Sequence, residues 1–308
     1  DPEAGECVFR SGERSPKIGF RLIHELACDG FPVAVVCRVL KVSTSVYYEW
    51  RSRRPSARDV EDAYLIDAIR ELHRLARGTY GVRRVHAELV LGRRLRIGHG
   101  RVERLMRVAG LQGVHHRKWR RGGTGRLPAV FEDHVKRVFA ADSPDKLWVT
   151  DITQHRTSEG WVYCAAVIDV FSRRCVGWSI ADHLRTELVV DAIDMARWRR
   201  KPTGTIVHSD RGAQFTSWLF GARLREAGLM GSMGKVASAY DNALMESFFG
   251  SMQIELLDRR AWSTRAELGS AIFEWIEAFY NPRRRHSALG YRSPIEFETL
   301  HTTAAAAA

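Results

Sequence analysis

The sequence predicts an α/β domain behind a front of basic helices. After residue 131, short apolar strand-like segments alternate with helical segments, which is typical of a sheet covered by helices. Before residue 131, apolar residues recur at helical spacing. The chain has 308 residues, and a single hydrophobic core usually stops growing at about 250–300 residues. We therefore expect more than one domain.

The excess of positive charge lies entirely in the helical front. The formal net charge is +12; residues 1–130 hold 26 Lys and Arg against 14 Asp and Glu, whereas residues 131–308 hold 22 of each. Such an excess favours nucleic acid or an anionic membrane surface as a large partner. A run of charge on one helix is usually a solvated face, but a surplus spread over several helices favours contact with phosphates. We therefore expect the front to bind nucleic acid through its phosphates.

Nothing in the sequence indicates secretion or membrane insertion. No apolar run reaches the ~18 residues that a membrane span needs, and the opening DPEAGECVFR contains no basic-then-apolar signal. The five cysteines form no CxxC pair, which favours reduced thiols over a disulfide framework or a zinc site. We therefore expect a cytoplasmic protein.

The front divides into two helical regions and a linker. Residues 1–58 contain two short helices with a tight break before Ser43, which can cap the second. This pattern fits a helix-turn-helix or a small bundle with an aromatic core. Residues 59–111 form a second, more basic helical DNA-binding region. Residues 112–130 are rich in basic residues and glycine, which predicts a basic linker along the DNA backbone.

Residues 131–280 are predicted to form the core, and residues 281–308 a basic C-terminal tail. We expect strands over 146–153, 161–180 (two strands with a turn at FSRR), 205–210 and 229–236, and helices over 185–200, 216–228, 241–257 and 264–280. Trp148 and Trp161 are interpreted as core aromatic residues. Asp169 ends a strand, where turn capping explains it as well as chemistry does.

Three acidic residues stand where a sheet and a helix would direct them to one spot. Asp151 lies in an apolar strand, where a carboxylate is costly to bury unless it is paired or binds a metal. Asp210 ends a strand just before Gly212, and Glu246 lies beside the apolar stripe of its helix, with 35 residues between it and Asp210. Each alone is most simply an ion-pair or capping residue. Together they predict a site for Mg²⁺, which prefers carboxylate oxygens, and for phosphoryl transfer.

The surrounding motifs resemble the transposases of the insertion-sequence-three family, which share a retroviral-integrase-like DDE catalytic core. The matching stretches are LWVTDIT (147–153), HSDRGAQF (208–215), YNPRRRHSALGYRSPIEFE (280–298), TYGVRRVHAEL (79–89) and KVSTSVYYEW (41–50). The resemblance implies a ribonuclease-H-like core with a mixed five-stranded sheet, preceded by helix-turn-helix regions.

The resemblance also implies the chemistry. Asp151, Asp210 and Glu246 would be the catalytic residues and would bind two Mg²⁺ ions, for which Mn²⁺ can substitute. Water or a DNA 3′-hydroxyl would attack a phosphodiester, so that DNA is cleaved at element ends and transferred to a target through a circular intermediate. The implied partners are double-stranded DNA, at terminal inverted repeats and at the target, and at least one further copy of the chain.

Basic residues of the front, of the linker and near the acidic residues are predicted to contact DNA. They are Arg83, Arg84, Arg94, Arg101, Arg104, Lys118, Arg120, Arg121, Arg211, Arg284 and Arg285. Gln253 joins them, although many relatives carry Lys or Arg at that place. His208 and Gln214 are predicted to support Asp210 from the sides.

Two other functions fit parts of the pattern. A DNA-binding regulator without catalytic activity would need the basic front but no intact triad. A ribonuclease-H-like nuclease acting on RNA–DNA hybrids would need the core but neither the basic front nor the motif after residue 280.

Overall fold

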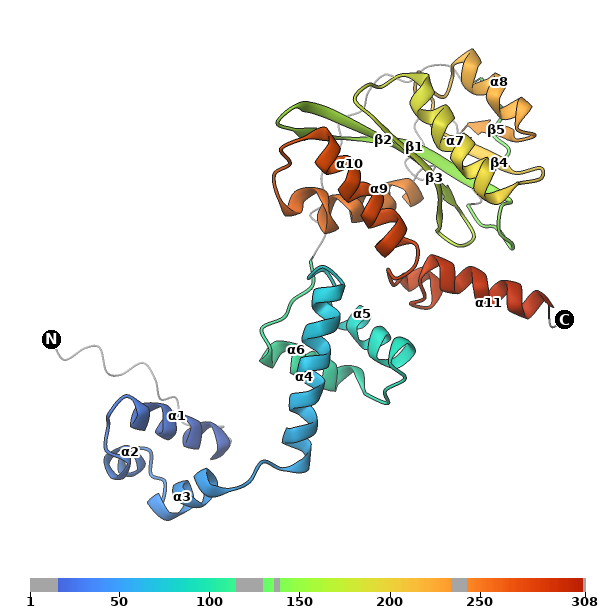
Figure 1. The fold of residues 1–308 in the computed structure, drawn as a ribbon. Coiled ribbons are helices and arrows are strands. Elements are labelled where there is room, and N and C mark those ends of the chain that lie inside the picture. The colour runs from blue at the N-terminus through green and yellow to red at the C-terminus, as the bar shows by residue number, and fades with distance from the viewer. Residues whose placement is uncertain (1–15, 115–129, 136–138, 234–242, 307–308) are drawn as a thin grey trace. The chain divides into compact units, whose positions relative to one another are not determined.

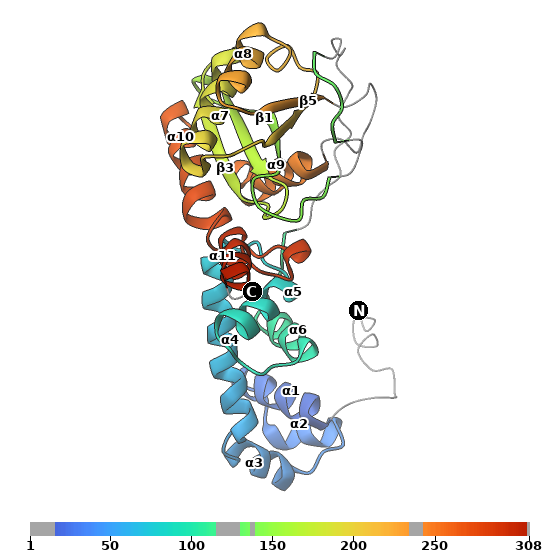
Figure 2. The same cartoon turned by 90° about the vertical axis from the view of Figure 1, so that its right-hand side faces the viewer.

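The computed structural model describes residues 16–114, 130–135, 139–233 and 243–306. The chain divides into two compact units, Asp1–Leu65 and Ile66–Ala308. The boundary falls inside α4 (Ala57–Leu75), which is one continuous helix (Figure 1, Figure 2).

The first unit is a small bundle of α1 (Pro16–Cys28), α2 (Val33–Val39) and α3 (Thr44–Ser52). Ile23, Val36, Cys37 and Tyr47 form its core, and Trp50 packs against them. Tyr47 and Trp50 give this bundle the aromatic core that the sequence left open beside a helix-turn-helix. Ser43 stands at the N-cap of α3, but its hydroxyl lies 2.7 Å from that of Ser45 and bonds to no backbone N–H.

The second unit begins with the helices of the basic region. They are the remainder of α4, α5 (Val82–Ala87), the π-helical turn η1 (Glu88–Gly92) and α6 (His99–Val108). Ile69, Val85, Leu89 and Leu105 are buried among them, with at most 1% of each residue exposed. The apolar spacing in the sequence predicted these helices because each turns one stripe inward.

A mixed five-stranded sheet follows. Its strands are β1 (Leu147–Thr157), β2 (Gly160–Asp169), β3 (Cys175–Ala181), β4 (Ile206–Ser209) and β5 (Met230–Met233). The order is β3-β2-β1-β4-β5; β2 runs antiparallel to β1 and β3, whereas β4 runs parallel to β1 and β5. This is the α/β class that the sequence pattern predicted, with the mixed five-stranded sheet that the family resemblance implied.

Helices cover both faces of the sheet (Figure 1). On one face, α7 (Thr186–Arg200) and α8 (Trp218–Glu226) share an apolar cluster with the strands. The other face carries α9 (Ala243–Glu255), which packs on β1, and α10 (Arg265–Glu274), which packs on β2. The chain continues through η2 (Leu257–Arg259), η3 (Trp275–Tyr280), η4 (Ser287–Leu289) and α11 (Pro294–Ala306).

The segment after residue 280 differs from the predicted basic tail. Asn281 is 2% exposed, and its side chain exchanges two hydrogen bonds of 2.9 Å with the backbone of Cys175 at the start of β3. The segment therefore belongs to the core, and a further helix, α11, follows it. Local charge suggested a basic tail in contact with phosphates, because the acidic partners of its arginines lie far away in the sequence.

The two tryptophans predicted to be core residues have different environments. Trp148 is fully buried, as predicted, whereas Trp161 is 43% exposed. Trp161 is the second residue of β2, close to the hairpin turn that joins β1 to β2, so the sheet leaves it partly uncovered. No helix in the described part of the chain has the length and apolar character that crossing a membrane requires.

Candidate active site and DNA-binding surface

Strand register places Asp151 beside Asp210. β4 pairs in parallel with β1, and Val149 lies opposite His208. Two residues later stand Asp151 on β1 and Asp210, the first residue after β4; paired strands lie about 4.8 Å apart. Two carboxylates 59 residues apart in the sequence thus become neighbours.

Both carboxylates point to the face of the sheet that carries α9. Trp148 and Val207 belong to the apolar cluster under α7 on the other face. Since successive side chains of a strand point to opposite faces, Asp151 and Asp210 face away from α7. Glu246 lies in the first turn of α9, which packs on β1. The same face therefore carries all three acidic residues.

The turn after β4 shapes the surroundings of Asp210. The backbone N–H of Gly212 donates to Asp210 Oδ1 at 2.9 Å, and a Cβ at position 212 would come within 3.0 Å of that oxygen. Glycine leaves room for the carboxylate in this turn. Asp151 is half-buried, and its Oδ1 accepts a hydrogen bond from the N–H of Ile152 at 2.8 Å.

Glu246 is the most open of the three acidic residues. Its side chain is exposed, whereas Met245 and Phe249 of the same helix are buried. Within the described ranges, no three His, Cys, Asp or Glu side chains lie close enough together to hold a metal ion. Asp241 and Asn242 precede α9 with side chains of the capping type and lie outside the described residues. Glu246 stands on α9, so the packing of α9 on β1 sets the distance from Glu246 to the aspartates.

The residues predicted to support Asp210 lie on either side of it. His208 is 3% exposed, and its Nδ1 lies 3.1 Å from the hydroxyl of Ser232 on β5. Gln214 donates from Nε2 to the carbonyl of Leu184, just before α7, at 3.1 Å. Both side chains hold the end of β4 against neighbouring elements.

Asp169 serves as a turn cap. It is fully buried and accepts hydrogen bonds from the N–H and the hydroxyl of Ser172, at 2.9 and 2.7 Å, and from the N–H of Asp145 at 2.9 Å. Burial raises the pKa of this carboxyl, and these hydrogen bonds oppose the rise. Capping accounts for Asp169 without any role in chemistry.

The predicted DNA contacts differ in their exposure. Arg83, Arg94 and Arg104 are exposed, and Arg101 and Arg211 are half-buried. Gln253 is half-buried on α9 and donates from Nε2 to Asp258. The three predicted linker contacts lie outside the described residues; they are Lys118, Arg120 and Arg121.

The structure corrects the prediction for Arg284 and Arg285. Their side chains are 5% exposed, Arg284 bonded to Glu255 and Arg285 to Glu88 and Glu296. Buried guanidinium groups with carboxylate partners are not available to phosphates. Arg84 is intermediate, because its side chain is 30% exposed and Nη1 lies 3.3 Å from Glu255 Oε1.

Sequence reasoning missed Glu255. The signal was present, since Glu255 follows the buried Phe248 by seven residues and Met252 by three, at the spacing of a helix stripe. A carboxylate in an apolar stripe indicates a cationic partner, and the arginine-rich motif after residue 280 supplies it.

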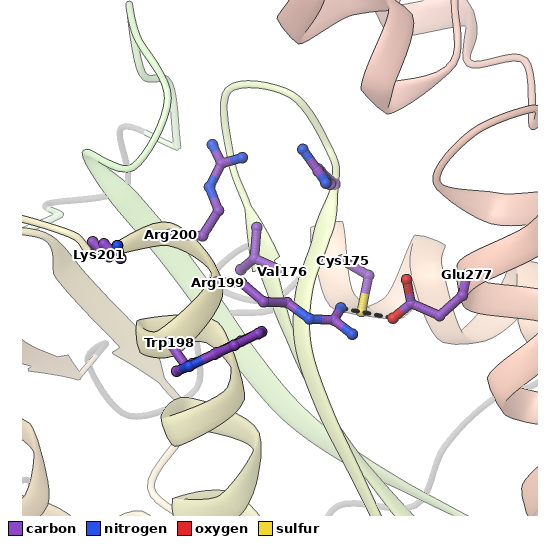
Figure 3. Close-up of a pocket in the computed structure, with 8 residues that line it drawn as sticks. Cys175, Val176, Trp198, Arg199, Arg200, Lys201 and Glu277 are labelled. Carbon is purple, nitrogen blue, oxygen red and sulfur yellow. Dashed lines mark hydrogen bonds and ion pairs between the residues drawn. The ribbon is translucent and has the colours of Figure 1, made fainter.

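A cavity of about 530 Å³ opens at the C-terminal end of α7 (Figure 3). Its lining includes Arg199 and Glu277, which form an ion pair at 2.7 Å, and Arg200, which pairs with Asp145 and Glu298. None of the three acidic site residues lines it. The paired cations tie α7 to η3 and α11, so this cavity is separate from the candidate active site.

Three protein-family models match parts of the chain. The integrase core domain family matches residues 141–239, and a second integrase core domain family matches residues 227–294. A helix-turn-helix-like domain family matches residues 59–119, the second helical region. The integrase match continues through residue 294, in agreement with the burial of the segment after η3.

Whole-chain relatives are bacterial transposases. The chain is 38% identical over 278 residues to the transposase for insertion sequence element IS629 of Shigella sonnei, covering 89% of this chain and 93% of that protein. It is 37% identical over 276 residues to the transposase InsF for insertion sequence IS3A of Escherichia coli, covering 87% and 94%. The HTLV-2 integrase catalytic core in complex with magnesium is a distant structural match, 15% identical with a TM-score of 0.40 over 52% of this chain and 99% of that one. This chain therefore belongs to the insertion-sequence-three family of transposases, with an integrase core behind helix-turn-helix-like helices.

Proposed function

We propose that this chain cleaves DNA at the ends of an insertion element and transfers the freed strand to a target. Asp151, Asp210 and Glu246 are the proposed catalytic residues. The strand register that brings Asp151 beside Asp210, on the face covered by α9, is the observation that carries the proposal. Membership of a transposase family agrees with it.

The proposed cofactor is Mg²⁺, as two ions, with Mn²⁺ able to substitute. Magnesium takes one or two carboxylates from a protein and keeps several waters, and the adjacent, half-buried aspartates fit that donor set. Bound there, the metal would neutralise charge on the phosphodiester and activate the attacking oxygen. Glu246 is the proposed third ligand and approaches from α9.

The remaining groups position DNA. The exposed Arg83, Arg94 and Arg104 supply charge for phosphate contacts in the front. His208 and Gln214 hold the end of β4 so that Asp210 keeps its place. Water or a DNA 3′-hydroxyl is the proposed nucleophile, so no covalent protein–DNA intermediate forms. Because two element ends must meet, at least two protomers act together on terminal inverted repeats and target DNA.

The test replaces Asp210 by Asn and measures binding and chemistry separately. Binding to a duplex that carries an element end is measured by footprinting with Ca²⁺, and cleavage and joining are measured with Mg²⁺. Asp210→Asn is expected to bind like the parent chain and to lose cleavage and joining by about 100-fold or more, because the group removed acts in the transition state.

The matched control is Asp191→Asn, which neutralises an exposed carboxylate on α7 away from the site. It is expected to cleave and join like the parent. Substantial residual joining by Asp210→Asn contradicts the triad. Preferential cutting of RNA–DNA hybrids indicates a ribonuclease-H-like nuclease instead, and binding without any Mg²⁺-dependent nicking by the parent chain indicates a regulator without catalytic activity.

A further inference from the structure

A buried group of charged side chains joins three separate elements at the C-terminal end of α9. Glu255, the last residue of α9, is 2% exposed. Arg284 donates to both of its carboxylate oxygens, with Nε at 2.8 Å from Oε2 and Nη2 at 2.7 Å from Oε1. Arg84 of α5 approaches Oε1 at 3.3 Å. We call Arg84, Glu255 and Arg284 the Glu255 cluster.

Further contacts surround the Glu255 cluster. Arg284 Nη2 also donates to the hydroxyl of Ser251, one turn earlier on α9, at 2.8 Å. Tyr80, just before α5, lies under the guanidinium of Arg84, and its hydroxyl accepts from the N–H of Arg285 at 2.8 Å. The cluster therefore connects the basic helices, the segment after η3 and α9.

The carboxylate of Glu255 bonds to two guanidinium groups, and these two groups differ in exposure. The side chain of Arg284 is 5% exposed, whereas that of Arg84 is 30% exposed. Burial lowers the pKa of Arg84, and the charge of Arg284 lowers it further, although Glu255 opposes both effects. Loss of Arg84 still leaves Glu255 with its stronger partner, so the fold can survive without Arg84.

The same helix carries Glu246 at its other end. Glu246 precedes Glu255 by nine residues, which is about 13.5 Å along the helix and about half a turn around it. Side-chain ends lie about 5–6 Å from a helix axis, so a rotation of α9 by about 10° moves the Glu246 carboxylate by about 1 Å. The apolar packing of Met245, Phe249 and Met252 has no preferred direction, whereas the hydrogen bonds of Glu255 have one. The bonds of Glu255 therefore restrict the rotation of α9 more closely than the apolar packing does.

We infer that Arg84 is a positioning residue that sets the rotation and height of α9, and thereby the place of Glu246 beside the two aspartates. Arg84 belongs to the helices that are proposed to hold DNA, so it links that region to the acidic site. This inference rests on the proposed function, because it concerns the assembly of the proposed metal site. Among the described residues, no three metal-binding side chains lie close enough together to hold a metal ion. A small shift of α9 therefore changes whether Glu246 can reach a metal beside the two aspartates.

The test compares Arg84→Met, which keeps the apolar part of the side chain, with Arg84→Lys, which keeps the charge. Mn²⁺ affinity is measured by calorimetry without DNA, and the cleavage rate is measured at saturating DNA across Mg²⁺ concentrations. Arg84→Met is expected to weaken Mn²⁺ binding by about tenfold, as indirect supports of metal sites do. It should also slow cleavage by about tenfold or more and raise the Mg²⁺ needed for half-maximal rate. Arg84→Lys should recover part of both losses.

Arg93→Met is the matched control, since the side chain of Arg93 is 31% exposed and pairs with Glu71 within the basic helices, away from α9. It is expected to keep the parent's Mn²⁺ affinity and Mg²⁺ dependence. If Arg84→Met matches Arg93→Met in Mn²⁺ affinity and in Mg²⁺ dependence, the inference is wrong and Arg84 is only a surface residue. It is also wrong if Arg84→Met loses DNA affinity while its cleavage rate at saturating DNA is unchanged, and Arg84 is then only a DNA contact. If the parent chain neither binds Mn²⁺ nor cleaves DNA, the proposed function itself fails.

Discussion

Replacing Arg284 by Met tests whether this arginine is a buried structural partner or a DNA contact. The change leaves Glu255, whose side chain is 1% exposed, with Arg84 at 3.3 Å as its remaining cation. Breaking a buried ion pair by removing one partner costs about 3–5 kcal/mol, because an uncompensated charge stays behind. Since Arg84 compensates in part, we expect a loss near 3 kcal/mol.

The assay is urea or thermal unfolding of the full chain. A loss of about 3 kcal/mol in a unit of this size lowers Tm by at least about 6 °C. Arg107→Met is the control, because Arg107 and its partner Glu103 on α6 have side chains 75% and 49% exposed. Such a surface pair contributes about 0–1 kcal/mol.

The opposite result is equally specific. Suppose that the free energy of unfolding of Arg284→Met lies within about 1 kcal/mol of the parent's, and that its DNA affinity is lower and depends less steeply on salt. Arg284 then contacts phosphates. Arg284 would then not be the buried partner of Glu255, and it would bind DNA as the charge pattern of the sequence suggests.

Three further predictions concern DNA binding, packing and pH. Arg83→Glu combined with Arg94→Glu should weaken DNA binding and leave the Mn²⁺ affinity unchanged. The slope of the logarithm of the DNA-binding constant against the logarithm of salt concentration should become shallower by about 0.9 per lost phosphate contact, and an unaltered slope would contradict this. Gly177→Ala should lower the free energy of unfolding by about 1–3 kcal/mol or more, because the new Cβ would lie 2.1 Å from the carbonyl oxygen of Ala192. Gly100→Ala is the control, because a Cβ at position 100 meets open space and should be tolerated. Burial and the charges of Arg284, Arg84 and Arg173 hold the pKa of His286 well below its usual range. Since the unfolded chain takes up this proton near pH 6.5 and the folded chain does not, the free energy of unfolding should fall as the pH drops below about 6.5. His286→Gln should make that fall less steep.

The sequence alone predicted the α/β class, the helical front and the positions of the three acidic residues. These features depend on local patterns: apolar residues repeat with the period of a helix or a strand, and Asp210 directly precedes a glycine turn. The strands and most helices of the core appear close to the predicted ranges because that periodicity reflects one-sided burial.

Tertiary structure alone decided which of those residues meet. The order β3-β2-β1-β4-β5 sets Asp151 beside Asp210, and no local pattern encodes the pairing of strands separated by two others in the sequence. The arginines after Asn281 look like a solvated run until α9 and η1 bring Glu255 and Glu88 against them. Charge in a sequence predicts exposure only when no opposite charge is folded onto it, because a buried cation is stable when a distant carboxylate compensates it.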